Sequence, residues 1–259
     1  MSAIMLESKI VHYEVLGRGR PVLFLHGWIG SWRYWIPVMQ AVSSTYRAYA
    51  LDFWGFGDTA RASQNYALNQ QVKLVQEVLD QMGIGRIALV GHGLGAAVAM
   101  LTALSDPQRF DRLMLVGFPF KEIQLSPRLQ TNSPVELCEW LLGRGWQDEP
   151  DFADVRKVDV EALQQSLVGL NETGLQQDWL TLQRPCLFVY AEKDLLVAPP
   201  ELSELPEWAH MIHFENSGHF MMHAESSQFN RLVLDFLNLE SGASPQQLQL
   251  KEEWKRRVR

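Results

Sequence analysis

Cysteine is scarce in this sequence, and long apolar runs are missing. The two cysteines, Cys138 and Cys186, show no spacing typical of a metal site, so we expect two buried free thiols. No apolar run approaches the roughly 20 residues that cross a bilayer. Residues 1–10 lack the basic and apolar segments of a secretory signal. We therefore expect a cytoplasmic protein without a membrane span.

A surplus of positive charge is missing as well. The formal net charge of −7 argues against a nucleic-acid-binding surface. The apolar fraction of 47% and the charged fraction of 20% are ordinary for a globular protein. A chain of 259 residues is long enough for one large α/β domain with a small insertion. We expect neither a nucleic-acid partner nor a metal or other cofactor.

Apolar strands alternate with helical segments along most of the chain. Strands are expected at residues 9–16, 21–25, 46–51, 87–90, 112–118, 185–190 and 209–214. Helices are expected at residues 32–43, 66–82, 96–104 and 223–239. This alternation predicts right-handed βαβ crossovers and a mainly parallel central sheet with helices on both faces.

One long segment, residues 120–183, interrupts this alternation. It is richer in Gln, Glu, Asp and Trp and carries two short helical patterns, at residues 134–142 and 160–170. We interpret it as a helical lid inserted into a core formed by residues 1–119 and 184–240. Residues 241–259 are expected to form a polar C-terminal tail, solvated and frayed from residue 246 onward rather than bound to an acidic partner.

Three glycines, Gly91, Gly93 and Gly95, form a sharp turn between an apolar strand and a helix. Asp194 and His219 each follow a later strand by a few residues, so both are expected at the carboxyl edge of the sheet, where ligand sites collect in open α/β folds. A carboxylate beside an imidazole is the pair that orients a catalytic base.

Four motifs in order resemble those of the α/β-hydrolase fold superfamily, over about residues 9–239. They are His26-Gly27-Trp28, Asp52-x-x-Gly55-x-Gly57, Gly91-x-Gly93-x-Gly95, and Asp194 with Gly218-His219. The resemblance implies the α/β-hydrolase fold, with Gly93 at the nucleophile position of the G-x-S-x-G elbow. It also implies Asp194 and His219 as the catalytic pair and the amides of Trp28 and Leu94 as an oxyanion hole.

Glycine at position 93 deletes the attacking hydroxyl but suits the turn, because an elbow holds its central residue at positive φ. A protein that no longer needs a covalent intermediate would carry such a glycine, and so would one whose serine had been removed deliberately. Water above Gly93, deprotonated by His219, is the favoured replacement nucleophile. Ser31, Ser217 and Cys138 are not expected to attack.

Aromatic residues gather after the first strands and in the lid. They either line an apolar pocket or pack the lid onto the sheet. The substrate is expected to contact His26, Gly27, Trp32, Trp54 and His92, with His26 holding its own loop and His92 packed beside the turn.

Three functions remain open at this point. The first is hydrolysis of a small apolar ester, lactone or related carbonyl compound through water. The second is a catalytically dead pseudo-hydrolase that binds an apolar small ligand. The third, cofactor-free oxygenation by a His/Asp pair, rests on the family resemblance alone, because the fold does not choose the reaction.

Overall fold

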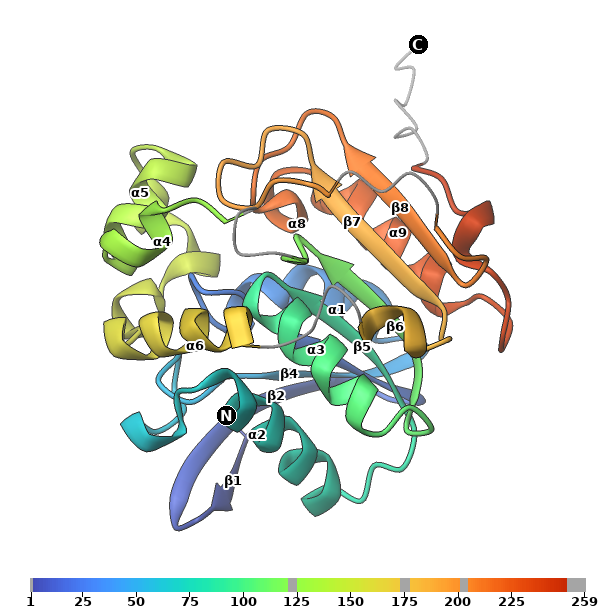
Figure 1. The fold of residues 1–259 in the computed structure, drawn as a ribbon, viewed down its shortest axis with the longest axis horizontal. Coiled ribbons are helices and arrows are strands. Elements are labelled where there is room, and N and C mark those ends of the chain that lie inside the picture. The colour runs from blue at the N-terminus through green and yellow to red at the C-terminus, as the bar shows by residue number, and fades with distance from the viewer. Residues whose placement is uncertain (1, 121–124, 173–177, 201–204, 251–259) are drawn as a thin grey trace.

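A single mixed sheet carries the fold in the computed structural model, which describes residues 2–120, 125–172, 178–200 and 205–250. The eight strands lie in the order β1-β2-β4-β3-β5-β6-β7-β8 (Figure 1). Their bounds are β1 Ser2–Leu6, β2 Lys9–Gly17, β3 Arg20–Leu25, β4 Tyr46–Leu51, β5 Ile87–His92, β6 Phe110–Val116, β7 Cys186–Ala191 and β8 Ala209–Phe214. The strands pair antiparallel from β1 to β4 and parallel across the rest of the sheet. The predicted mainly parallel sheet is confirmed.

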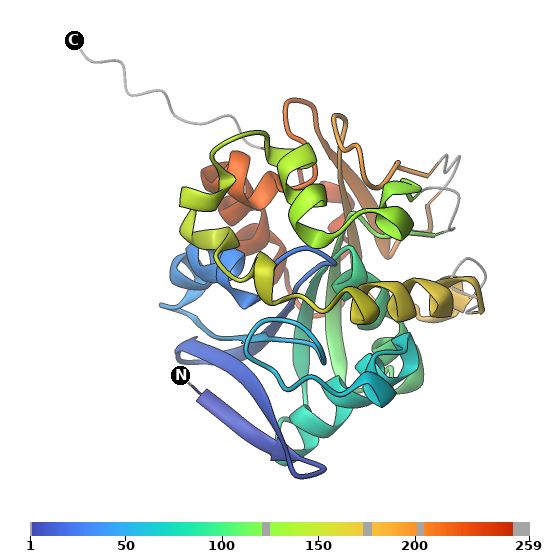
Figure 2. The ribbon, with the colours of Figure 1, turned by 90° about the vertical axis from the view of Figure 1, so that its left-hand side faces the viewer.

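Helices cover both faces of this sheet, as expected. Helices α1 (Ile36–Val42) and α9 (Ser226–Leu237) contact each other, and so do α2 (Leu68–Gln81) and α3 (Leu94–Ser105). Figure 2 shows the first pair on one side of the sheet and the second pair on the other. A four-residue helix, α8 (Met221–Ala224), precedes α9. In α9 the buried side chains are the predicted apolar stripe, which includes Phe229, Leu232 and Phe236.

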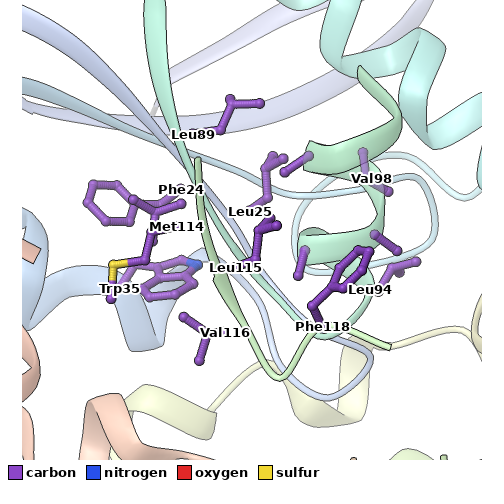
Figure 3. Packing of buried hydrophobic residues seen from close by; sticks show 14 of the residues in the cluster. Phe24, Leu25, Trp35, Leu89, Leu94, Val98, Met114, Leu115, Val116 and Phe118 are labelled. Atoms are coloured by element: carbon purple, nitrogen blue, oxygen red, sulfur yellow. The ribbon is translucent and has the colours of Figure 1, made fainter. Parts of the chain in front are cut away.

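Helix α3 lies unusually close to the sheet because its first turns carry small residues. Ala96, Ala97 and Ala99 are fully buried, and Leu94 and Val98 pack beside the strands (Figure 3). A Cβ added at Gly95 would lie only 2.6 Å from the main-chain oxygen of His26. Only glycine fits at this crossing, so the helix that follows the Gly93 turn is fixed against the strand ends.

Between β6 and β7 the chain forms a separate group of short helices. These are α4 (Arg128–Thr131), α5 (Pro134–Leu142) and α6 (Val160–Glu172), with 3-10 turns at Trp146–Asp148, Pro150–Phe152, Val155–Lys157 and Trp179–Thr181. The helices expected at residues 134–142 and 160–170 are observed. Ser133 and Glu136 form a capping box that begins α5. Figure 1 places α4, α5 and α6 together on one side of the core; we call residues 125–172 the cap.

A buried carboxylate, Asp154, joins the cap to the core. Its Oδ2 accepts hydrogen bonds from Ser31 Oγ at 2.9 Å and Arg33 Nε at 2.7 Å, and its Oδ1 lies 2.8 Å from Lys157 Nζ. Burial by itself would raise the pKa of Asp154, but the hydrogen bonds from Lys157, Ser31 and Arg33 outweigh it and hold the pKa below its ordinary value.

Replacing this carboxylate by the neutral amide, Asp154→Asn, is expected to lower the free energy of unfolding by about 1–3 kcal/mol at neutral pH, because hydrogen bonds to the charged group are lost. Since the folded pKa is lowered, this stabilisation is present above the ordinary aspartate pKa and disappears as the pH falls through the folded value. Urea unfolding measured across that range should therefore converge for variant and wild type in acid. The exposed cap residue Asp148, changed to Asn, is the control; equal losses in both variants would contradict this assignment.

The two ends of the described chain differ from expectation. Strand β1 was not predicted, yet it pairs with β2 from Ser2 opposite Tyr13 to Leu6 opposite Lys9. At the other end, Leu248 is buried and its carbonyl oxygen lies 3.0 Å from His210 Nε2. The chain thus packs on β8 through residues 245–248, where a frayed tail was expected from residue 246 onward, because Pro245 and Leu248 are apolar enough to be buried. The basic end of the tail lies outside the described residues.

Both cysteines are free and buried, as predicted. Among the helices of the described ranges, none is at once long and apolar enough to cross a bilayer.

Candidate active site

The turn at Gly93 connects β5 directly to α3. Gly93 has φ +51° and ψ −110°, a backbone conformation that side-chain-bearing residues rarely adopt. Its neighbours are equally constrained, since a Cβ at Gly91 would lie 2.7 Å from the Cα of Ala96. The three glycines therefore serve the geometry of the turn and the close approach of α3.

Asp194 and His219, expected at the same edge of the sheet, are in contact. Asp194 follows β7, His219 follows β8, and His219 Nδ1 lies 2.9 Å from Asp194 Oδ2. The amides of Leu196 and Val197 donate to Asp194 Oδ1 at 2.7 and 3.2 Å, which fixes the carboxylate. Both side chains are only 1% exposed. Because Nδ1–H donates to the carboxylate, the other ring nitrogen, Nε2, carries the lone pair of a base.

That second nitrogen is the unusual atom of the site. His219 Nε2 is buried and has no hydrogen-bond partner among the residues that the structure describes. The ring of His219 lies 4.4 Å from the ring of His92, centroid to centroid, and His92 directly precedes Gly93. The base is therefore beside the glycine turn, and a buried polar atom without a partner is a place where a ligand or water would bind.

His92 is held from the opposite side by Tyr34. The Tyr34 hydroxyl accepts a short hydrogen bond from the Gly27 amide, so its proton is directed to His92 Nδ1, 3.2 Å away. Burial holds the pKa of His92 well below its ordinary value, and the neighbouring His219 acts in the same direction. His92 is thus a neutral, fully buried ring packed beside the turn.

Trp28 covers the turn with its side chain, which was not foreseen. A Cβ at Gly93 would lie 3.1 Å from both Cε3 and Cζ3 of the indole. The indole N–H donates to Ser166 Oγ of α6 at 3.2 Å. The sequence predicted a role for the Trp28 amide and a general aromatic cluster; its one signal for this contact is a large ring directly after His26-Gly27.

The two amides expected to form an oxyanion hole lie at the start of this turn and in the facing loop. Leu94 is the first residue of α3, where helix geometry leaves an amide without an intrahelical partner. Within the described ranges, neither the Leu94 amide nor the Trp28 amide donates a hydrogen bond to the protein. Their role as an oxyanion hole stays a prediction.

Three residues expected to contact substrate have other partners. His26 Nδ1 lies 2.8 Å from the Gly27 carbonyl oxygen, and its Nε2 accepts from the Phe53 amide at 3.1 Å, so His26 holds its loop. The main chain of Trp54 exchanges hydrogen bonds with the Gln71 side chain. The ring of Trp32 packs 5.8 Å from that of His12, and the Trp32 amide donates to Asp52. No contact recorded in the described ranges joins Trp32 to the Asp194–His219 pair.

The side chains considered as replacement nucleophiles are engaged elsewhere. Ser31 Oγ donates to Asp154, and Ser217 Oγ makes a short hydrogen bond to Glu225. Cys138 is buried in the cap, and burial raises the pKa of its thiol to about 12. None of the three is free to attack a substrate at Gly93.

One cluster in the described residues has ligand atoms close enough for a metal ion: His12, Asp52 and Asp58. Its atoms already serve the fold, because Asp52 Oδ2 lies 2.8 Å from His12 Nδ1 and accepts from the Asp58 amide at 3.0 Å. These hydrogen bonds explain the cluster without an ion.

The comparisons with known proteins agree with this geometry. A family profile described as "Alpha/beta hydrolase family" matches residues 22–232. Epoxide hydrolase 4 of Homo sapiens is 34% identical over 116 residues, which are 43% of this chain and 32% of the relative; the match thus spans about a third of that protein. The 2-hydroxy-6-oxo-2,4-heptadienoate hydrolase of Pseudomonas putida is 27% identical over 266 residues, covering 87% of this chain and 91% of the relative.

Solved structures show the same fold. A serine-to-glycine variant of the N-acyl homoserine lactonase AidH, complexed with N-hexanoyl homoserine lactone, has a TM-score of 0.78 at 20% identity and covers 91% of this chain and 96% of that chain. At this identity the similarity concerns the fold.

Proposed function

Because this chain belongs to the alpha/beta hydrolase family, we propose that it hydrolyses a small apolar ester, lactone or related carbonyl compound through water activated by Asp194 and His219. The supporting observation is His219 Nε2, a buried base that is oriented by Asp194 and has no partner in the described part of the chain. Such an atom requires a donor, and water is the donor that hydrolysis supplies.

The proposed reaction uses these groups in turn. His219 Nε2 takes a proton from water, and the resulting hydroxide attacks the substrate carbonyl. The amides of Trp28 and Leu94 donate to the oxyanion. Collapse of the intermediate breaks the bond to the alkoxide, which takes the proton from Nε2. General-base assistance contributes about 10²–10⁴-fold, and each oxyanion donor about 2.7–4 kcal/mol, so turnover without a covalent intermediate is slow but measurable.

His219→Ala is expected to lower kcat/KM for p-nitrophenyl butyrate or N-hexanoyl homoserine lactone by roughly 10²–10⁴-fold, because it removes the base. Asp194→Asn should also lower the rate, because the amide no longer holds Nδ1–H of the imidazole. His213→Ala, on β8, is the control, since the ring of His213 packs against Tyr190. Equal rates for wild type and a folded His219→Ala variant would refute the proposal.

A second function is favoured by one observation, the packing of Trp28 on Gly93. A site closed over its vacant nucleophile position also suits a pseudo-hydrolase that binds an apolar ligand. Saturable binding of N-hexanoyl homoserine lactone with thermal stabilisation, but without turnover above the His219→Ala background, would favour this function over hydrolysis.

A further inference from the structure

The indole of Trp28 occupies the space directly above Gly93. Two of its ring carbons lie 3.1 Å from the point where a Cβ at position 93 would sit, and the whole residue is 0% exposed. This separation is at the tight limit of ordinary carbon contacts, so any side chain at position 93 would press against the ring. Glycine is therefore the residue that lets the indole lie flat on the turn.

The same indole is tied to the cap by a single hydrogen bond. Its N–H donates to Ser166 Oγ at 3.2 Å, across 138 positions of sequence. Ser166 is fully buried in α6, and its hydroxyl donates to the Leu163 carbonyl oxygen at 2.7 Å. Because its proton is used there, the hydroxyl oxygen accepts the hydrogen bond from Trp28. This neutral hydrogen bond is separate from the charged contacts of Asp154, so breaking it leaves those contacts in place.

The base of the site is buried. His219 Nε2 has no partner in the described part of the chain, although its ring is fixed by Asp194 and lies 4.4 Å from the ring of His92, which directly precedes Gly93. A buried nitrogen lone pair without a hydrogen-bond donor is energetically unfavourable, whereas a ligand that carries a donor would satisfy it.

We propose that Trp28 is the gate of this site and that its indole occupies the space in which the ligand binds. The gate opens when the Trp28–Ser166 hydrogen bond breaks and the ring leaves Gly93. The group that then takes this space is flat and apolar, of about the size of the indole, and carries an N–H or O–H donor for Ser166 Oγ. This inference rests on the proposed function in one respect, since it assumes that ligands reach Gly93 and His219.

The gate is tested by the reaction of His219 with diethyl pyrocarbonate, which acylates an accessible neutral imidazole and is quantified by peptide mass spectrometry. Minor open states are commonly populated at about 0.1–10%, so Trp28→Ala should speed labelling of His219 by roughly tenfold or more. Ser166→Ala, which removes the tether and the hydroxyl's hydrogen bond to Leu163 but leaves the indole in place, should speed labelling less. Trp179→Ala is the matched control, because Trp179 is also buried but packs against Phe120, Phe188 and Trp208.

The nature of the replaced group is tested in the same assay with free indole as the probe. An apolar cavity left by a deleted side chain takes up a ring of matching size, so indole should protect His219 in the Trp28→Ala variant. Protection should be weaker in the Trp28→Ala, Ser166→Ala double variant, where the acceptor for the indole N–H is missing. Naphthalene, which has the size of indole but no donor, should protect less than indole does.

Two results would overturn the gate. The first is that a folded Trp28→Ala variant labels His219 no faster than the wild type does. The second is that Trp179→Ala speeds labelling of His219 as much as Trp28→Ala does. Neither depends on hydrolysis, which is decided separately by turnover in His219→Ala. A functioning gate without turnover identifies a ligand-binding site, whereas turnover without gating leaves the hydrolase proposal intact and removes this one.

Discussion

Gly93→Ser is expected to become covalently labelled by a fluorophosphonate probe, whereas the wild-type chain stays unlabelled. The turn already has the positive φ of +51° at which a serine would project from the start of α3. His219, fixed by Asp194 at 2.9 Å, would accept the hydroxyl proton, and the Trp28 and Leu94 amides would stabilise the phosphonyl oxygen. The change therefore adds the one group that the site lacks.

This gain has a cost in stability. A side chain at positive φ costs about 1–3 kcal/mol, and the added Cβ must displace the Trp28 ring by a few tenths of an ångström. For a domain of this size, Tm falls by roughly 2–4 °C for each kcal/mol. Gly93→Ala is the matched control: it should lose similar stability and remain unlabelled.

Labelling should also require the base, so Gly93→Ser combined with His219→Ala should not react. A folded Gly93→Ser protein that resists the probe would show that His219 Nε2 or the two amides do not face position 93. The proposed mechanism would then fail, because water above Gly93 depends on the same groups.

Gly95→Ala is expected to lower the stability of the protein more than the same substitution at Gly91 or Gly93, the other two glycines of the turn. The added Cβ would lie 2.5 Å from the carbonyl carbon of Leu25 and 2.6 Å from the carbonyl oxygen of His26. Both are main-chain atoms of the strand end and loop that face α3, so they cannot rotate away as a side chain would. Overpacking typically costs about 1–3 kcal/mol and more where nothing yields, and we expect a loss above about 3 kcal/mol.

Thermal unfolding by circular dichroism measures this loss, with a Tm decrease of roughly 10 °C or more or failure to obtain folded protein. Gly85→Ala is the control, because a Cβ there meets nothing within 4 Å. That variant should change stability little, or raise it by about 0.4–1 kcal/mol through the unfolded state. A Gly95→Ala protein that melts with the wild type would mean that α3 lies farther from the sheet than described.

Much of the fold could be predicted because its signals are local. The apolar runs at residues 21–25 and 46–51 are strands β3 and β4, and the segment at residues 134–142 is helix α5. In α9 the predicted apolar stripe is the buried face. Strand β1 escaped because its five residues alternate too briefly to stand out, and it gains its place only by pairing with β2.

The candidate site was predictable to the extent that topology fixes it. Asp194 and His219 follow neighbouring parallel strands, so their approach follows from the sheet order alone. The sequence could not show that the Trp32 ring packs on His12, because the direction of a loop side chain depends on what surrounds it. The expected contact of Trp32 with substrate stays a prediction.

The sequence by itself determined the family and the order in which its four motifs occur, since these depend on residue types and spacing. It also places glycine at position 93, which we predict to be a nucleophile position without a nucleophile. Only the tertiary structure decided that the Trp28 ring lies on Gly93, that Ser166 of the cap receives its N–H, and that Asp154 joins the cap to Ser31 and Arg33. The reason is physical: these contacts join segments far apart in the sequence, and their side-chain directions are set by packing between layers rather than by local periodicity.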